Sequence, residues 1–189
     1  MATRRIALIQ GHPDPAGGHL DHALADAWTA GAESAGHHVD PIPVAELDFP
    51  LLRQPADFEH GEPPAAIATV QQTLLAADHW TIVFPLWLGG PPALLKGFLE
   101  QALRPGFFHP AGGGHPLRGR SVRLVVTMGM PATLYRLWFH AHGVRMVERS
   151  ILRFAGLGPI RTTLLGLVER PGARARWLRR MERQGRRGR

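Results

Sequence analysis

Apolar positions along the chain form short uninterrupted runs that alternate with helical repeats, and Trp80–Phe108 is the clearest example. Residues 80–84 are β-branched or aromatic and apolar on both faces, which is typical of a strand covered by helices on each side. Pro85 ends this strand, and two more prolines precede a predicted helix at 92–103. The loop 85–90 therefore follows the carboxyl end of a buried strand, where open α/β sheets bind ligands.

The rest of the chain repeats this order of strand and helix. The pattern predicts strands at 5–11, 37–42, 80–84, 122–127 and 159–167, and helices at 21–35, 65–77, 92–103 and 173–183. The segment 134–154 is predicted to be largely helical. We expect the Pro-rich segment 43–64 to be a connection and 105–119 to be a long exposed excursion. Regular alternation implies a parallel sheet wound on both faces. With the first strand central, this is a flavodoxin-like three-layer α/β sandwich with a five-stranded parallel sheet of order 2-1-3-4-5.

Length and charge distribution favour one domain with a basic end. The 189 residues are 44% hydrophobic, which is enough for one core, and no linker or repeat divides them. We expect a single flavodoxin-like domain over 1–169 and an Arg-rich C-terminal helix and tail over 170–189. That tail holds nine arginines and one acid, whereas the remainder is nearly neutral. We therefore expect a basic end that frays into solvent, and no nucleic-acid partner.

Several kinds of site and location are disfavoured by the sequence. Cysteine is absent, which excludes disulfides and thiolate catalysis. The first apolar run is about five residues long, too short for a signal peptide, and no apolar stretch approaches the roughly 20 residues that span a bilayer. We expect a cytoplasmic protein without a transmembrane segment. The pairs His19/His22 and His140/His142 lack a convergent carboxylate or third ligand, so we expect no metal site.

The turn after the first strand is a candidate anion site. Its sequence, GHPDPAGGHLDHA, lies between a strand and a helix, where backbone N–H groups and the helix dipole can hold a phosphate. The glycines match neither the P-loop nor the dinucleotide-binding pattern. His12 or His19 could donate a hydrogen bond to a phosphate oxygen, and the alternative is a plain surface turn. In the predicted topology this turn and the loop 85–90 both leave the sheet at its switch point.

One segment resembles a known family: FPLWLGGPPALLKGFLEQALRPGFF, preceded by ALIQGHPDP and followed by VVTMGM. It is similar to the flavin-dependent NAD(P)H:quinone oxidoreductases of the flavodoxin-like fold. These include vertebrate quinone reductases, bacterial modulators of drug activity, and ancillary subunits of glutathione-gated potassium efflux systems. The resemblance extends from about Arg5 to Leu167. It implies FMN or FAD as cofactor, with FMN slightly preferred, NAD(P)H as co-substrate, and ping-pong hydride transfer through flavin N5 to a quinone-type acceptor.

The resemblance also implies roles for individual residues. His12 would hold the flavin phosphate. One loop would pack on the isoalloxazine ring and hydrogen-bond to it: Pro85, Leu86, Trp87 and Leu88. A second loop around the ring would be formed by Thr127, Met128, Gly129 and Met130. Tyr135 and His142 resemble the tyrosine and histidine that stabilise the reduced flavin during hydride transfer, and they are the candidate catalytic residues.

The chain departs from the family at the end of the first loop. Where the family usually has a serine or threonine, and an asparagine, this chain has Gly18 and Asp21. An acid beside a phosphate is unfavourable unless it caps the helix and points away. The usual Thr-Gly-Gly of the second loop is also replaced here by residues 127–130, TMGM.

Other interpretations of the same residues stay open. The aromatic side chains Trp87, Phe98, Phe107 and Phe108 also fit a core, or a homodimer in which one subunit completes the other's pocket. Tyr135 also fits the surface of an amphipathic helix. Two rival functions are a flavodoxin-type electron carrier, disfavoured by the near-neutral body, and a regulatory flavoprotein subunit docking on a membrane transporter, with the basic tail near anionic lipid.

Overall fold

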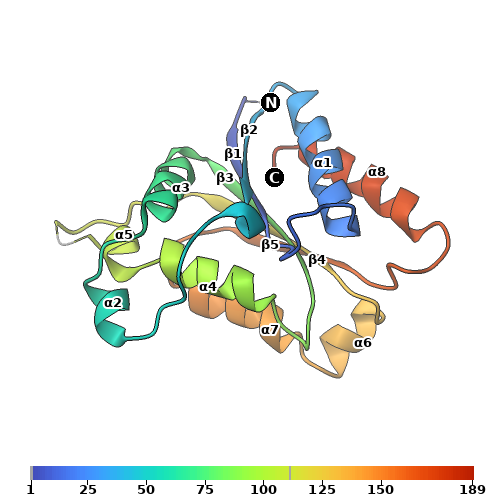
Figure 1. Ribbon diagram of the computed structural model, residues 1–189. Helices are drawn as coiled ribbons and strands as arrows, with labels where there is room; N and C mark the ends of the chain where they lie inside the picture. Colours follow the sequence, from blue (N-terminus) through green and yellow to red (C-terminus); the bar gives the residue numbers. More distant parts are fainter. Residues whose placement is uncertain (1, 111) are drawn as a thin grey trace.

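The computed structural model, which describes residues 2–110 and 112–189, is built on a five-stranded parallel sheet with helices on both faces (Figure 1). The strands are β1 (Arg5–Gln10), β2 (His38–Pro43), β3 (His79–Pro85), β4 (Ser121–Thr127) and β5 (Ile160–Leu165). Their order is β2-β1-β3-β4-β5, and each neighbouring pair is parallel. The predicted sheet order and flavodoxin-like architecture are confirmed.

The helices form two layers around the sheet (Figure 1). On one face lie α1 (Leu20–Glu33) and α8 (Ala173–Gly185). The other face is covered by α3 (Ala65–Ala76), α4 (Ala93–Ala102), α7 (His142–Arg145) and the π-helix η2 (Met146–Arg153). Shorter helices occupy the connections: η1 (Val44–Glu46), α2 (Pro55–Glu59), α5 (Pro105–Phe108) and α6 (Ala132–Leu137). In the part of the chain that is described, no helix combines the length and apolarity needed to cross a membrane.

Strand β3 lies at the centre of the hydrophobic core. All seven of its residues are buried, because it has a strand on each side and helices over both faces. Ile82 and Phe84 point into the cluster under α3, α4 and η2, whereas Val83 points into the cluster under α1 and α8. The side chains therefore alternate between two separate cores, and the loop after β3 begins from a rigid support.

The segment 134–154 is largely helical, as predicted, but it is not a single helix. The chain forms α6, breaks, and then continues as α7 and η2. His140 and Ala141, at the break, have positive φ angles of 49° and 50°, which an L-residue in a right-handed helix does not adopt. The break matters for the site because it brings the start of α7 back onto α6.

The excursion 105–119 is less exposed than its Gly and Pro content indicates. Phe108, on α5, and Leu117 are both buried in the core cluster under α3 and α4. The segment between them carries four consecutive exposed residues, 112–115. Two apolar side chains thus hold both ends of the excursion against the body, a contact that local composition does not reveal.

The basic end of the chain is packed rather than frayed, contrary to the expectation from charge. Helix α8 lies along α1, and Met181 is fully buried between them and the sheet. Two glycines allow the helix backbones to approach closely. A Cβ at Gly185 would lie 2.0 Å from the Trp28 carbonyl oxygen, and a Cβ at Gly31 would lie 2.1 Å from the Glu182 carbonyl oxygen.

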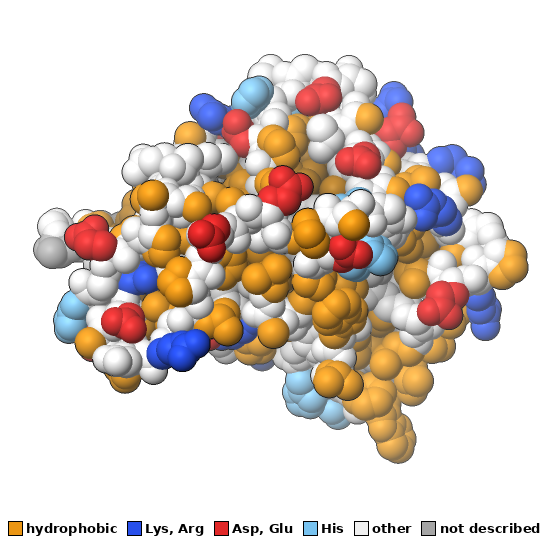
Figure 2. All heavy atoms as spheres, viewed as in Figure 1, with side chains coloured by type: hydrophobic (Ala, Val, Ile, Leu, Met, Phe, Trp, Pro, Cys, Tyr) orange, Lys and Arg blue, Asp and Glu red, His pale blue; other side chains and the backbone are white. Residues whose placement is uncertain are grey.

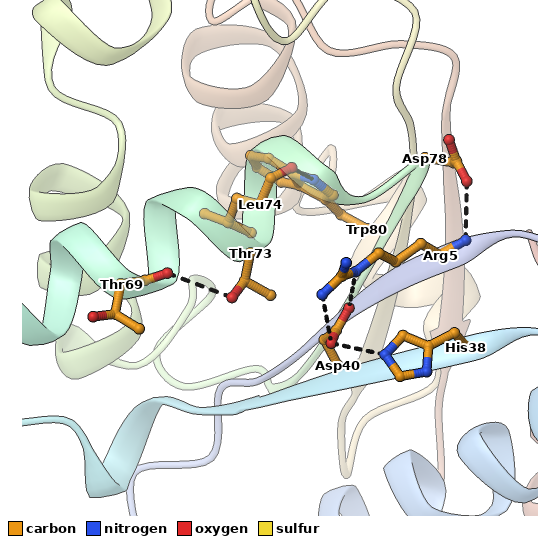
Figure 3. Close-up of polar contacts among 8 residues, drawn as sticks. All are labelled: Arg5, His38, Asp40, Thr69, Thr73, Leu74, Asp78 and Trp80. Carbon is orange, nitrogen blue, oxygen red and sulfur yellow. Dashed lines mark hydrogen bonds and ion pairs between the residues drawn. The ribbon is translucent and has the colours of Figure 1, made fainter.

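Polar side chains link β2, an outermost strand of the sheet, to its neighbour β1 (Figure 3). Arg5 Nε donates a hydrogen bond of 2.7 Å to Asp40 Oδ2, and His38 Nε2 lies 3.1 Å from Asp40 Oδ1. This arginine holds the pKa of Asp40 below its usual value. The backbone N–H of Arg5 donates to Asp78 Oδ2 at 2.9 Å, so the start of β1 is linked to the residue before β3.

We expect Gly185→Ala to lower the free energy of unfolding by about 1–3 kcal/mol, because the new methyl group meets the Trp28 backbone and forces the helices apart. Chemical denaturation measures this change. Gly106→Ala is the matched control, since a Cβ at Gly106 has nothing within 4 Å. Equal stability of the two variants would contradict the close packing of α8 on α1.

Candidate functional site

Two loops meet beyond the carboxyl ends of β1 and β3. Because these strands pair directly and in parallel, the loops that follow them leave the same edge of the sheet side by side. The Trp87 ring from the second loop stands edge-on to the His12 ring of the first, with centroids 6.1 Å apart. The loop after β4 emerges on the other side of β3. This juxtaposition is the one predicted from the topology.

His12 is the buried centre of a histidine cluster. Its side chain lies 4.0 Å from the stacked ring of His19 and 5.1 Å from the ring of His22, between centroids. Burial, and then these two histidines, hold the pKa of His12 below its usual value, so the ring is neutral at neutral pH. The backbone N–H of Asp14 donates to His12 Nδ1 at 3.2 Å. The hydrogen of the neutral ring therefore lies on Nε2, which is a donor available to a ligand.

The first loop also presents unpaired donors at the start of α1. Gly17 and Gly18 have φ angles of 75° and 79°, which let the backbone turn tightly before the helix. His19, the N-cap residue, forms no side-chain cap hydrogen bond. Beneath the loop, Gln10 Nε2 and His22 Nδ1 are buried without a partner among the described residues. This donor set, at a helix N-terminus, suits an anion such as a phosphate.

Asp21 lies in the first turn of α1, but its carboxylate is directed toward β4. Both carboxylate oxygens lie 3.0 Å from Thr127 Oγ1, which donates its single hydrogen to them. Burial raises the pKa of Asp21 to about 6. The Asp21 carboxylate is thus turned away from the first loop. In this orientation its charge does not stand against a phosphate bound in that loop. The same contact commits the Thr127 hydroxyl, predicted to lie beside the flavin ring, to a hydrogen bond within the protein.

The loop after β3 is a tight two-residue turn. Trp87 and Gly90 exchange backbone hydrogen bonds of 2.9 and 3.0 Å across it, and Leu88 and Gly89 between them have φ angles of 46° and 82°. Positive φ at both central residues is the type I′ geometry. Leu86 N–H donates to the Thr127 carbonyl oxygen at 2.8 Å, which continues the sheet past Pro85. The N–H groups of Leu86 and Trp87, which were expected to face the flavin ring, thus donate hydrogen bonds within the protein. The Leu88 N–H has no partner in the described chain.

Tyr135 holds this turn in place from below. Its side chain is 1% exposed, so the alternative that it lies on the surface of its helix is wrong. The phenol donates a hydrogen bond of 2.9 Å to the Gly89 carbonyl oxygen and accepts one of 3.3 Å from Val144 N–H. Burial raises the pKa of Tyr135, so the phenol stays protonated. Gly143 touches the same turn, where a Cβ would lie 2.0 Å from the Gly89 carbonyl oxygen.

The remaining predicted residues lie around the same edge of the sheet. Met128 is buried, Met130 is half-buried, and Gly129 between them is exposed. His142 is exposed at the start of α7, one residue before Gly143, and its ring centroid lies 5.6 Å from that of His140. Among residues 2–110 and 112–189, no group of three or more His, Asp or Glu side chains is arranged to hold a metal ion.

Sequence reasoning missed Gln10 and Gly143. Gln10 Oε1 accepts the His12 backbone N–H at 2.5 Å, and the available signal was a polar residue ending an otherwise apolar strand. Gly143 carries no comparable signal, because its contact with Gly89 joins segments far apart in the chain.

An exposed apolar surface lies beside the turn, over α6 (Figure 2). Its members are large hydrophobic side chains with exposed fractions of 45–110%: Trp87, Leu88, Leu134, Leu137, Trp138 and Phe139. Trp138 and Leu137 are each about three-quarters exposed. A contiguous apolar surface of this kind marks an interaction site in a soluble protein.

A 2-1-3-4-5 parallel sheet with helices on both faces, and with the first turn and an aromatic loop meeting at its switch point, defines a flavodoxin-like protein. The chain belongs to this family, whose model, described as "Flavodoxin-like fold", matches residues 4–184.

Individual relatives are quinone oxidoreductases by name. The chain is 26% identical over 216 residues to NAD(P)H dehydrogenase [quinone] 1 of Rattus norvegicus, covering 96% of this chain and 78% of that protein. It is 27% identical over 170 residues to the FMN-dependent NADH:quinone oxidoreductase of Ruegeria pomeroyi, covering 72% and 83%. Among solved structures, NAD(P)H:quinone oxidoreductase from Methanothermobacter marburgensis matches with a TM-score of 0.82 and 21% identity, over 98% of this chain and 96% of that one. At that identity the likeness shows the fold.

We expect Asp21→Asn to stabilise the protein at pH 7 by about 1–3 kcal/mol. The pKa of Asp21 in the folded protein, about 6, lies above the usual value of 3.8, so the charged carboxylate costs folding free energy above pH 6. Wild-type stability should therefore fall as the pH rises from about 4 to 6, whereas the amide, which still accepts the Thr127 hydroxyl, removes that dependence.

Denaturation of both proteins between pH 4 and 8 measures the difference. Asp26→Asn, an exposed acid on the same helix, is the control and should leave the wild-type profile intact. A gap between wild type and Asp21→Asn that does not change with pH would contradict the raised pKa.

Proposed function

We propose that this protein is a flavin-dependent NAD(P)H oxidoreductase that passes two electrons to a quinone-type acceptor. The observation that carries the proposal is the meeting of the His12 turn and the Trp87 turn at one edge of the sheet. The first offers unpaired donors for a phosphate, and the second offers an exposed aromatic surface beside it. The names of the relatives support the same class of reaction.

The residues of the first turn fit the phosphate end of a flavin. Neutral His12 would donate from Nε2, and His19 stacks on it with its own Nε2 bonded to Asp14 at 2.7 Å. The start of α1 adds backbone donors and the positive end of the helix dipole. We propose FMN as the flavin, with FAD as the alternative, because the R. pomeroyi relative is FMN-dependent by name.

The isoalloxazine ring would lie between the two later loops. Leu86, Trp87 and Leu88 would flank one side, and Met128, Gly129 and Met130 the other. When bound, the flavin supplies the redox chemistry, taking a hydride at N5 from NAD(P)H and passing two electrons to the quinone in ping-pong alternation. The free Leu88 N–H would donate to the ring and stabilise negative charge that develops there.

We assign Tyr135 a positioning role and His142 a role at the substrate. The phenol hydrogen of Tyr135 is committed to Gly89, so this residue acts by fixing the turn that faces the ring. His142 is exposed beside that contact, one residue before Gly143, and its imidazole would face the bound substrate.

The apolar surface over α6 supports a homodimer. Large exposed side chains adjoin the Trp87 turn, so a second copy of the chain covering them would also wall the substrate pocket and exclude water. The acceptor would then bind over the ring between two subunits.

We expect the purified protein to show the visible absorption bands of a flavin, either directly or after incubation with FMN. The bands should bleach with NADPH or NADH and return with a quinone, because the same site serves both substrates. Heat release and chromatography then distinguish FMN from FAD. A protein that takes up neither flavin would overturn the proposed function.

We expect Gly143→Ala to weaken FMN binding by about tenfold or more, because its methyl group displaces the Gly89 carbonyl and with it the whole turn. Fluorescence quenching of FMN measures the affinity. Gly106→Ala again serves as the control and should bind FMN as the wild type does. Unchanged affinity in Gly143→Ala would remove the Trp87 turn from the proposed site.

A further inference from the structure

A second concave region lies at the amino ends of the strands, whereas the proposed flavin site lies at their carboxyl ends. It is a cavity of about 620 Å³ at the amino ends of β3 and β4, and five arginines contribute to its lining: Arg4, Arg118, Arg120, Arg161 and Arg189. Arg120 is already bonded to the carbonyl oxygens of Pro116 and Leu75, and Arg4 to that of Gly188. Arg118 and Arg161 are exposed, and neither guanidinium has a hydrogen-bond partner in the described chain.

A groove along α8 carries further positive charge. It encloses about 500 Å³ and includes Arg176, Arg180, Arg183 and Arg187. Gln184, from the same groove, reaches Thr163 Oγ1 on β5 at 3.4 Å. The groove therefore lies beside β5, an outermost strand of the sheet.

Buried Arg123 connects the two regions. Its Nη1 donates a hydrogen bond of 2.9 Å to Thr163 Oγ1, and its Nε is buried without a partner among the described residues. Burial, followed by four other arginines, lowers the pKa of Arg123 to about 10; those four are Arg161, Arg180, Arg187 and Arg189. Arginines from the cavity and from the α8 groove thus lie close enough to act on the same guanidinium.

The positive charge here is not balanced by acids. Within the described chain, the ion pairs formed by arginine are Arg5–Asp40 and Arg186–Glu182, and neither includes a residue named around Arg123. Asp78 lines the cavity, but its carboxylate accepts the Arg5 backbone N–H (Figure 3).

Buried His79 responds to the same excess of charge. Burial, and then Arg123, Arg4 and Arg161, lower the pKa of His79 to about 3. Because the His79 ring is neutral, the positive charge of this region comes from the guanidinium groups. An arrangement that concentrates so many guanidinium groups near a single carboxylate, that of Asp78, is stabilised by a bound polyanion.

We propose that this arginine cluster, defined as Arg4, Arg123, Arg161, Arg180, Arg187 and Arg189, binds a small molecule that carries two or more phosphate groups. Guanidinium forks match phosphate oxygens, and several forks from the cavity and the α8 groove, gathered around Arg123, favour a ligand with several phosphates. The cavity volume is in the range of small-molecule sites. The proposal does not depend on the flavin site, which lies at the other end of the strands.

The geometry favours a small ligand over a membrane surface. A helix that binds lipid inserts an exposed apolar face, but the apolar face of α8 is packed on α1 through Met181 and Gly185. Trp177 is half-buried, with the Arg176 guanidinium 4.3 Å above its ring. The arginines that remain line concave regions rather than a flat surface.

Calorimetric titration with sodium tripolyphosphate tests the proposal, at about 0.15 M salt to suppress weak surface binding. The test variant is Arg161→Gln/Arg187→Gln, which removes two exposed cluster arginines. Arg53→Gln/Arg149→Gln is the matched control, since it removes the same charge from exposed positions elsewhere. We expect the Kd to rise by about tenfold or more in the test variant and less than about twofold in the control. Equal weakening in both variants, or no binding to the wild type, would overturn the proposal.

Two further measurements separate alternatives. The first is sedimentation with phosphatidylserine vesicles. If the wild type sediments with the vesicles, the test variant does not, and the wild type fails to bind tripolyphosphate, the small-ligand proposal would be overturned in favour of a membrane surface. Arg161→Gln alone should weaken tripolyphosphate binding in the same direction, which guards against a folding defect in the double variant. NADPH oxidation should be unchanged in both, because the flavin site is at the opposite edge.

Discussion

The burial of β3 is the constraint on which the rest of the structure depends. Its seven residues are enclosed by β1, β4 and two helical layers, so the strand cannot shift without opening both cores. The sheet pairing also extends beyond the strand: Gly11 N–H donates to the Val83 carbonyl oxygen, and Leu86 N–H to that of Thr127. The two loops of the candidate site are therefore extensions of the sheet. Tyr135 then fixes the tip of the second loop through Gly89.

Charge is distributed unevenly between the two ends of the sheet. At the carboxyl end, the turn after β1 offers neutral donors and a helix terminus, and its buried acid is turned toward Thr127. At the amino end, guanidinium groups outnumber carboxylates, and burial together with these groups lowers the pKa values of His79 and Arg123. The first arrangement suits a single phosphate beside a large apolar ring. The second suits a ligand of high negative charge, so the two ends of one sheet offer different chemistry.

The order of elements and the meeting of the two candidate loops were predictable from local patterns. Apolar runs and prolines mark β3 and its loop, and a parallel sheet brings that loop beside the first turn. Prediction failed where a contact between distant segments overrides local preference. Residues 134–154 have helical periodicity, yet His140 and Ala141 adopt left-handed φ angles that fold α7 onto α6. The charge of the last helix predicted a frayed end, yet Gly31 and Gly185 let it pack on α1.

The sequence by itself determined the strand order, the buried central strand and the end of the sheet where the two candidate loops meet, because periodicity and turn residues act over short distances. Only the tertiary structure decided how individual polar groups are used. It turned Asp21 toward Thr127, committed Tyr135 to Gly89, and brought arginines from β5, α8 and the end of the chain near the guanidinium of Arg123 on β4. Each of these contacts joins residues far apart in the chain, and burial sets its strength, so no local pattern encodes it.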